Sequence, residues 1–476
     1  MVNDDVQPRR LGAVLTVLLV PYFMSVFDVY VVNVALPTIR RDLNAGPLIL
    51  ELVVSGFAFT YAAALVTGGR LGDLRGHRTV FVVGVAAFTV ASLLCGIAPT
   101  GELLVVFRLI QGLTAALMVP QVLAMITAVF PEERRSWAVA WVGVASGLAA
   151  AAGQVLGGFL VDADILGLSW RSIFLINIPI GLVGTTFAIW LLPRTVTRPR
   201  RLDLVGAGGV AATVGLVLLP LSLGGTNGWS PWLVACLVAA FPAGIATWLY
   251  QRRLTARNGD PVLDLTLFRV RSYLAGVAAI AAWFATMTGI LLTYSLLLQS
   301  GLGHSALYTG LAMLPMALTY SVTSLTGNRL VARFGSNVIV AGCAVVALSL
   351  IVFWLGLDTA PGGRIGLADV LVALFLYGAG AGCILPRLLV LSMTQVKPGQ
   401  AGIGSGMLNT GQQFAAALGA AGFGAAFFAT AGHVPSVSGD ARGMQIALII
   451  AIVLVAVVAA LVLFISKQSV GRERLR

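Results

Sequence analysis

The chain has 476 residues, of which 58% are hydrophobic and only 10% are charged, and its formal net charge is +12. This composition excludes a soluble globular protein. Because the apolar runs exceed the roughly 20 residues that a helix needs to cross a bilayer, it predicts an all-α polytopic membrane protein. The four cysteines and three histidines have no metal-ligand spacing, so we expect neither a metal site nor a cofactor.

The apolar runs, broken at charged or Pro/Gly-rich segments, predict fourteen membrane-spanning helices. In chain order they cover residues 11–36, 48–69, 79–97, 102–128, 136–160, 172–192, 204–223, 231–250, 272–298, 307–327, 338–356, 367–392, 402–429 and 444–465. The first span is too long for a cleavable signal, and no small-residue cleavage site follows it, so we expect it to remain as a helix.

The positive charges predict how these spans are oriented. With both termini in the cytoplasm, 23 of the 30 Lys and Arg residues fall in inside segments and five outside, while Arg108 and Arg387 lie within spans. This bias favours cytoplasmic termini, and its spread over short loops excludes a nucleic-acid-binding patch. The preference for Arg over Lys, with abundant Ala and Gly, indicates a GC-rich bacterial gene, so we expect the bacterial cytoplasmic membrane.

A short segment occurs twice and suggests an internal repeat. RLGDLRG, residues 70–76, follows the second span, and RLVARFG, residues 329–335, follows the tenth. If both join the second and third helices of a six-helix half, the plan is six plus two plus six helices: a first half in residues 1–200, an inserted hairpin in 201–258 and a second half in 259–476. Chance similarity in a chain rich in Gly and Arg is the alternative.

Three patterns in the first half carry glycines or charges. GGRLGDLRGHR, residues 68–78, is a glycine-bounded loop with one acid and several arginines, which suits a charge-linked joint between helices. RLIQG, residues 108–112, places Arg108 and Gln111 on one helical face. Glycines at i, i+4 allow the fifth span to pack closely or bend; they are Gly143 and Gly147, then Gly153 and Gly157, followed by Gly158.

An aspartate interrupts the first apolar span. Asp28 lies about eight residues, or roughly 12 Å, from the predicted outer end of its helix, and Arg108 lies about six residues, or roughly 9 Å, from the outer end of the fourth span. Because the depths nearly coincide and buried charges are costly, we expect the two to pair. A carboxylate that moves between an apolar environment and an arginine takes up and releases a proton. A static ion pair that fixes helix packing is the alternative.

Several other polar residues lie within the spans. Asn33 suits either hydrogen bonds between helices or contact with a substrate, and we expect Gln111 to line the substrate cavity. A polar stripe in the thirteenth span is either a helix contact or a cavity wall; it consists of Ser405, Asn409, Gln412 and Gln413. Arg387 either extends to the cytoplasmic edge or contacts an anionic substrate.

Together these motifs resemble the 14-helix drug:proton antiporters of the major facilitator superfamily, from end to end of the chain. FDVYVVNVALPTI matches the first-helix motif of that branch at Asp28, Asn33, Ala35, Leu36 and Pro37, and the loop motif is matched at Gly69, Leu71, Asp73, Arg75, Gly76 and Arg78. RLIQG is similar to the fourth-helix arginine motif, and SWRSIFLINIPIG, residues 169–181, is similar to the start of helix six. The resemblance implies a major facilitator fold with proton coupling at Asp28. It also implies that the loop motif is a conformational latch, although a simple cluster of topology charges is the alternative.

The sequence departs from this family pattern at three points. Gln154 replaces the proline of the fifth-helix antiporter motif, which weakens antiport as an inference from that motif. Ala332 stands in the second loop where Asp73 stands in the first. The second half has no deep carboxylate, which argues against a specialist for dicationic compounds.

We therefore expect a monomeric, proton-coupled secondary exporter of small amphipathic compounds such as drugs, working by alternating access. Its partners are protons, the substrate and the lipid bilayer. The alternatives are a dedicated exporter of an endogenous metabolite or lipid, or a proton-coupled importer. Neither of the two lysines lies in a GK[ST] motif for ATP, and no nucleophile, base and ligand set converges as in an enzyme.

Overall fold

The computed structural model describes residues 8–164, 167–195, 203–227, 230–257, 265–298, 306–359, 367–394, 401–431 and 437–473, with 259, 261–263, 302, 304 and 396 between them. These residues form helices and short connections and contain no strand. The predicted all-α membrane fold is confirmed.

Thirteen helical segments of the described chain are long and apolar enough to cross a membrane. The predicted span at 307–327 is not among them, because it is divided into α11 (Ala306–Ala312) and α12 (Leu314–Phe334). Pro315 lies in the first turn of α12 and has no N–H to continue the preceding helix. A count of apolar residues does not detect such an interruption.

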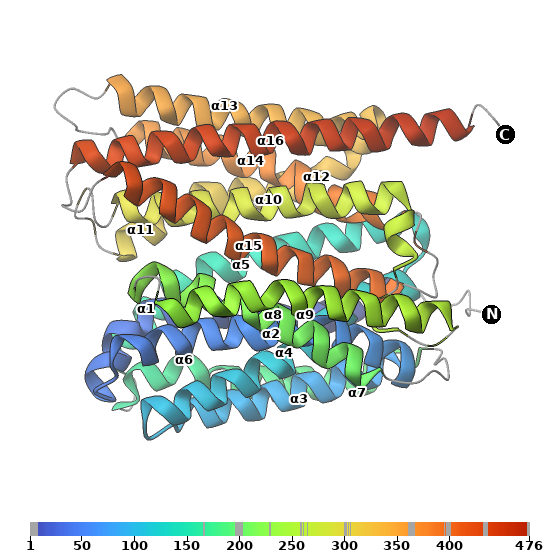
Figure 1. The fold of residues 1–476 in the computed structure, drawn as a ribbon, viewed down its shortest axis with the longest axis horizontal. Coiled ribbons are helices and arrows are strands. Elements are labelled where there is room, and N and C mark those ends of the chain that lie inside the picture. The colour runs from blue at the N-terminus through green and yellow to red at the C-terminus, as the bar shows by residue number, and fades with distance from the viewer. Residues whose placement is uncertain are drawn as a thin grey trace. The chain divides into compact units, whose positions relative to one another are not determined.

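The first of two compact units comprises residues 1–223, 230–265 and 396–410. Its core helices are α1 (Pro8–Asp42), α2 (Pro47–Arg75), α3 (His77–Gly96), α4 (Gly101–Val129), α5 (Glu132–Asp162), α6 (Ser172–Leu175) and α7 (Asn177–Leu191). Within it α4 packs against both α2 and α3, α5 packs against α1, and α7 packs against α3 (Figure 1). Helix α1 also packs against α7, α4 and α2.

The second compact unit comprises residues 224–229, 266–395 and 411–476. It contains α10 (Arg271–Leu296), α11, α12, α13 (Asn337–Thr359), α14 (Leu367–Met393) and α16 (Val437–Glu473), while α15 (Ala401–Ala431) runs through both units. Here α14 packs against α12 and α13, and α16 packs against α10 and α13. The predicted residue limits of the three parts of the chain stay a prediction.

The hairpin consists of α8 (Leu204–Asn227) and α9 (Pro231–Ala256), and α9 and the part of α8 up to Leu223 are grouped with the first unit. Asp203, which is buried, joins their ends: its carboxylate accepts hydrogen bonds from the Gly206 N–H at 2.8 Å, the Tyr250 hydroxyl at 3.0 Å and Gln251 Nε2 at 2.7 Å. Gln251 Oε1 in turn accepts from the Leu263 N–H at 3.1 Å. One carboxylate thus ties the start of α8 to the end of α9 and to the chain beyond it.

The two units repeat one helix crossing. Thr60 Oγ1 on α2 donates to the Leu109 carbonyl on α4 at 2.8 Å, and Thr319 Oγ1 on α12 donates to the Phe375 carbonyl on α14 at 2.9 Å. Each threonine lies ten residues before the arginine that opens its loop segment, RLGDLRG or RLVARFG. The two segments therefore follow equivalent helix pairs.

Glycines allow this close approach in both units. A Cβ atom on Gly112 would lie 2.4 Å from the Phe57 carbonyl oxygen, and one on Gly378 would lie 2.1 Å from the Met316 carbonyl oxygen. Both distances are too short for any side chain, so the crossing requires glycine at these two positions.

Candidate functional site

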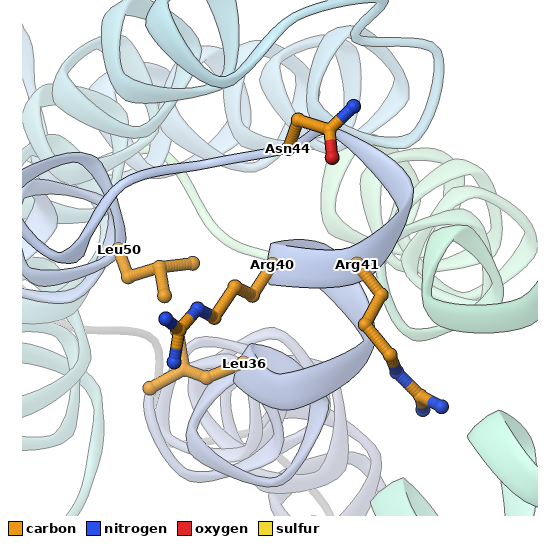
Figure 2. Close-up of a pocket in the computed structure, with 5 residues that line it drawn as sticks. All are labelled: Leu36, Arg40, Arg41, Asn44 and Leu50. Atoms are coloured by element: carbon orange, nitrogen blue, oxygen red, sulfur yellow. The ribbon is translucent and has the colours of Figure 1, made fainter.

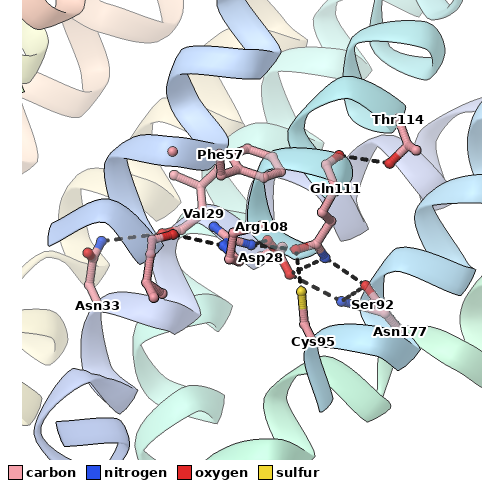
Figure 3. A network of polar contacts seen from close by, with 12 residues as sticks. Asp28, Val29, Asn33, Phe57, Ser92, Cys95, Arg108, Gln111, Thr114 and Asn177 are labelled. Atoms are coloured by element: carbon pink, nitrogen blue, oxygen red, sulfur yellow. Dashed lines mark hydrogen bonds and ion pairs between the residues drawn. The ribbon is translucent and has the colours of Figure 1, made fainter. Parts of the chain in front are cut away.

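The Asp28 and Arg108 side chains form a buried ion pair between α1 and α4 (Figure 3). Arg108 Nη1 donates to Asp28 Oδ2, and the two side chains are 0% and 1% exposed. A lone charge at this depth is costly, whereas a hydrogen-bonded pair compensates each charge with the other.

Gln111, one turn after Arg108 on α4, connects both partners of the pair. Its Nε2 donates to Asp28 Oδ1 at 3.0 Å and to Ser92 Oγ on α3 at 2.7 Å. Its Oε1 accepts from Arg108 Nη1 at 2.6 Å and from Cys95 Sγ at 3.5 Å. Gln111 is fully buried, and it lies in the charged network; a separate role in a substrate cavity stays a prediction.

Asn177 completes the network from the first residue of α7. Its Nδ2 lies 3.4 Å from Asp28 Oδ1 and 3.2 Å from Ser92 Oγ. The helix is interrupted between α6 and α7 at Ile176, and Pro179 explains the break because it has no N–H for the carbonyl of Leu175, where α6 ends. Asn177 Oδ1 is buried and has no hydrogen-bond partner within the described part of the chain.

The guanidinium group of Arg108 is enclosed on its other sides. Its Nε donates to the Val53 carbonyl on α2 at 3.0 Å, and its Cζ lies 4.5 Å from the ring centroid of Phe57 and 5.7 Å from that of Phe174. Backbone oxygen and aromatic faces both favour a cation. Arg108 is thereby held in place independently of Asp28.

Glycines of α5 pack directly behind the Asp28 segment of α1. A Cβ atom on Gly153 would lie 2.8 Å from Tyr30 Cβ, and one on Gly157 would lie 2.8 Å from Val31 Cγ2. These two of the predicted packing glycines bring α5 against α1. Of the others, Gly143 is buried and Gly147 and Gly158 are half-buried, while the side chain of Gln154 lies outside the described residues.

The remaining predicted substrate residues are Asn33 on α1 and three residues of α15. Asn33 is exposed, and its Nδ2 donates to the Val29 carbonyl of its own helix at 3.3 Å. Asn409, Gln412 and Gln413 are half-buried on α15. Their contact with a substrate stays a prediction.

The predicted latch segment surrounds the tight connection between α2 and α3. Gly76 ends α2 and precedes α3 with a φ of 89°, a conformation that favours glycine. Gly69 is buried and Arg75 is exposed, whereas Arg78 donates to the Ile189 carbonyl on α7. The segment is thus attached to a neighbouring helix through a backbone oxygen.

A histidine links the acid of this segment to α4. His77 Nε2 lies 3.6 Å from Asp73 Oδ1, and His77 Nδ1 lies 2.8 Å from Gln121 Oε1. Gln121 Nε2 donates to the Gly68 carbonyl at 2.8 Å. The contacts join α2, α3 and α4 at the end that the charge bias predicts to be cytoplasmic.

Arg387 occupies the matching place on α14, directly after a proline as Gln121 is on α4. It is 7% exposed, so it is not directed to water. Its guanidinium donates to the Gly382 carbonyl and, at 2.9 Å, to the Ser324 carbonyl on α12, and it packs on Gly327. Backbone carbonyl oxygens therefore hold this cation between the two helices.

The positions of α14 that correspond to Arg108 and Gln111 of α4 carry an apolar and an aromatic residue. Leu374 and Tyr377 have the same spacing to Gly378 as Arg108 and Gln111 have to Gly112. The Tyr377 ring stacks on Trp283 of α10 with 6.1 Å between centroids.

An open pocket of about 620 Å³ lies at the C-terminal end of α1 (Figure 2). Leu36, Arg40, Arg41, Asn44 and Leu50 line it, and Arg40 extends between the two leucines while Arg41 points away from them. Arg40 is about 18 Å from Asp28 along the helix axis. The pocket is therefore separate from the ion-pair network.

Beside this pocket, Asp42 joins the end of α1 to the 3-10 turn Ser169–Arg171. Its Oδ2 accepts from Trp170 Nε1 at 2.9 Å and from Arg171 Nη1 at 2.5 Å. The hydrogen bonds from Trp170 and Arg171 hold the pKa of Asp42 below its usual value. The first-helix and sixth-helix motifs thus meet at this carboxylate.

Sequence reasoning missed Ser92, Cys95 and Asn177 as members of the network. Asn177 lies within SWRSIFLINIPIG, where an amide among apolar residues just before a proline was a usable signal. Ser92 and Cys95 have no such signal, because small residues are common in apolar spans.

In the part of the chain that the structure describes, a buried ion pair links helices that are apolar enough to span a membrane, and charged residues within such helices are typical of membrane transporters. The sequence model of the Major Facilitator Superfamily matches residues 18–420, and the chain belongs to this family. It is 35% identical over 434 residues to a probable actinorhodin transporter of Streptomyces coelicolor, covering 90% of this chain and 75% of that protein. It is also 35% identical over 430 residues to a cephamycin export protein of Amycolatopsis lactamdurans, covering 84% of this chain and 82% of that protein.

A solved structure supports the fold alone. The human organic anion transporter MFSD10 matches with a TM-score of 0.66 at 17% identity, covering 95% of this chain and 100% of that one.

Proposed function

We propose that the protein is a proton-coupled exporter of small amphipathic compounds such as drugs or antibiotics, in which Asp28 carries the proton and Arg108 is its counter-charge. The single observation that carries the proposal is the fully buried Asp28 to Arg108 pair, because it places one titratable group where four helices meet. The relatives named as a probable actinorhodin transporter and a cephamycin export protein support the substrate class, and the second name supports the direction.

In this mechanism, protonation of Asp28 removes the negative charge that holds α1 to α4. Arg108 keeps its contacts to Gln111 Oε1 and the Val53 carbonyl, so the cation stays on α4 while α1 loses its ionic attachment. Breaking such a buried pair costs about 3 to 5 kcal/mol, which is enough to bias two conformations of a helix bundle. Substrate binding then favours the deprotonated pair, and the exchange is an antiport.

The proposal also includes the predicted roles of the loop segment and of the α5 glycines, and the predicted oligomeric state and orientation. The loop residues Gly69, Asp73, Arg75, Gly76 and Arg78 act as the conformational latch, and the α5 glycines keep α5 against α1. The protein works as a monomer in the bacterial cytoplasmic membrane with both termini cytoplasmic.

A dedicated exporter of an endogenous antibiotic is the second candidate function, favoured by the names of the two relatives. The substrate range separates the candidates: a multidrug exporter lowers the susceptibility of expressing cells to ethidium and to unrelated antibiotics, whereas a dedicated exporter protects against one structural class.

The proposal is tested in proteoliposomes with an imposed pH gradient, in which ethidium movement is followed by fluorescence. We expect ethidium to accumulate on the acidic side and the pH gradient to collapse faster when ethidium is present. Movement that ignores the pH gradient would contradict proton coupling, and a pH-driven flow toward the alkaline side would indicate an importer.

A further inference from the structure

We propose that Asn177 is the hydrogen-bond acceptor for protonated Asp28, and that its carboxamide turns over when the proton binds; this rests on the proposed role of Asp28 as proton carrier.

The network as observed satisfies only the ionised form of Asp28. Its carboxylate receives three donors, from Arg108, Gln111 and Asn177. A carboxylic acid carries an O–H that must itself donate, and a buried donor without an acceptor is unfavourable. Protonation therefore requires an acceptor close to one of the two carboxyl oxygens.

The acceptors nearest to the carboxyl group are already in use, with one exception. Gln111 Oε1 receives Arg108 and Cys95, and Ser92 Oγ receives Gln111 and Asn177. Asn177 Oδ1 is buried and receives no hydrogen bond within the described part of the chain. It belongs to the same carboxamide whose Nδ2 faces Asp28.

A half-turn of this carboxamide exchanges its donor and its acceptor. Rotation about the Cβ–Cγ bond of Asn177 places Oδ1 where Nδ2 now lies, toward Asp28 Oδ1 and Ser92 Oγ. The turn gives up the two Nδ2 contacts, at 3.4 Å to Asp28 and 3.2 Å to Ser92, and both are long for hydrogen bonds. The turned Nδ2 lies where Oδ1 now has no partner among the described residues, so the new hydrogen bond from the carboxyl O–H must offset the loss of these two contacts. The Ser92 hydroxyl, which now accepts from Asn177, then donates to it. Both protonation states of Asp28 are thereby satisfied by one side chain.

The proton balance involves Asp28 alone. A proton from water binds Asp28 Oδ1, and no bond between heavy atoms changes. Among the described residues, the charged or titratable groups that contact the site are Arg108 from α4 and the Cys95 thiol from α3. Elsewhere α2 presents a backbone oxygen, α7 presents Asn177, and α5 presents glycines. Arg108 stays protonated in proteins, so it does not take up the proton in place of Asp28. Asn177 has no titratable group and acts as a positioning residue for the carboxyl proton.

Infrared difference spectroscopy of the whole protein in lipid, recorded during acidification, tests this proposal. The C=O stretch of protonated Asp28 is identified as the band that disappears in Asp28→Asn. We expect that band to shift in Asn177→Leu, which keeps the volume but has no acceptor, and to stay in place in the control Thr114→Val, which removes a buried hydroxyl of α4 that donates to the Gln111 backbone carbonyl. Asn177→Ala should behave alike and replaces the leucine variant if that one does not fold.

An Asp28 band at the same frequency in wild type and in both Asn177 variants would overturn the role of Asn177 and leave the proton carrier intact. Equal shifts in Thr114→Val and Asn177→Leu would also overturn it, because they would indicate a general loosening of the helix packing around the network. If Asp28→Asn removes no band at any pH, Asp28 does not titrate, and both the inference and the proposed function fail.

Discussion

Neutralising Asp28 alone and together with Arg108 separates a proton carrier from a static ion pair. Asp28→Asn keeps the shape of the side chain and an oxygen that can accept from Arg108, but it leaves the buried guanidinium without its counter-charge. Removing one partner of a buried pair costs about 3 to 5 kcal/mol, whereas replacing both charges is close to neutral. The single variant should therefore melt well below wild type, and Asp28→Asn with Arg108→Gln should recover most of the difference.

Transport should follow a different order from stability. If Asp28 carries the proton, both the single and the double variant lose pH-driven ethidium export in proteoliposomes, although the double variant is stable. Apparent melting midpoints are compared at one scan rate, and Glu102→Gln serves as the control, since it makes the same chemical change at an exposed position of α4. A double variant that exports at the wild-type rate under a pH gradient would refute the assignment and leave the pair with a purely structural role.

Three further predictions concern the framework of the first unit, each read as a melting midpoint in detergent. Gly153→Ala should lower the stability of the protein by about 1 to 3 kcal/mol because the new Cβ would overlap α1. The control Gly208→Ala, whose Cβ would meet no atom within 4 Å, should be neutral or stabilising. Equal effects of the two substitutions would contradict the packing role of Gly153. Asp42→Asn should destabilise by at most about 1 kcal/mol, with a constant difference from wild type between pH 7 and 5. Because the pKa of Asp42 is lowered in the folded state, its contribution is present above the usual carboxyl value of about 3.9 and lost as the pH falls further; a difference that vanishes already at pH 5 would be inconsistent with this. Gly76→Ala should cost about 1 to 2 kcal/mol at its φ of 89°, and the same change at Gly46, whose φ is −68°, should cost less.

The depth of side chains along the membrane axis was predictable from sequence because the rise of a helix is fixed. Counting from the predicted span ends placed Asp28 and Arg108 at nearly equal depth, and the structure places them in contact. Thirteen of the fourteen predicted spans were found for the same reason, since apolar length decides whether a helix reaches across a bilayer.

The rotation of each helix about its axis was not predictable. Spans that are apolar all round carry no periodic signal to show which face meets a neighbour. Gln111 was therefore assigned to a substrate cavity although its side chain lies on Asp28, and Ser92 could not be told from any other small residue. The interruption before α12 was missed because Pro315 lies in an otherwise apolar run.

The glycine crossings at Gly112 and Gly378 give the molecule an internal comparison of its own. Both positions bring equivalent helix pairs together through the same contacts, but four residues earlier one helix carries Arg108 and the other carries Leu374. The same substitution at each glycine would widen the helix crossing, at Gly112 near the charge of Arg108 and at Gly378 near the apolar side chain of Leu374. The difference between the two outcomes measures how strongly helix spacing is linked to electrostatics, without reference to any other protein.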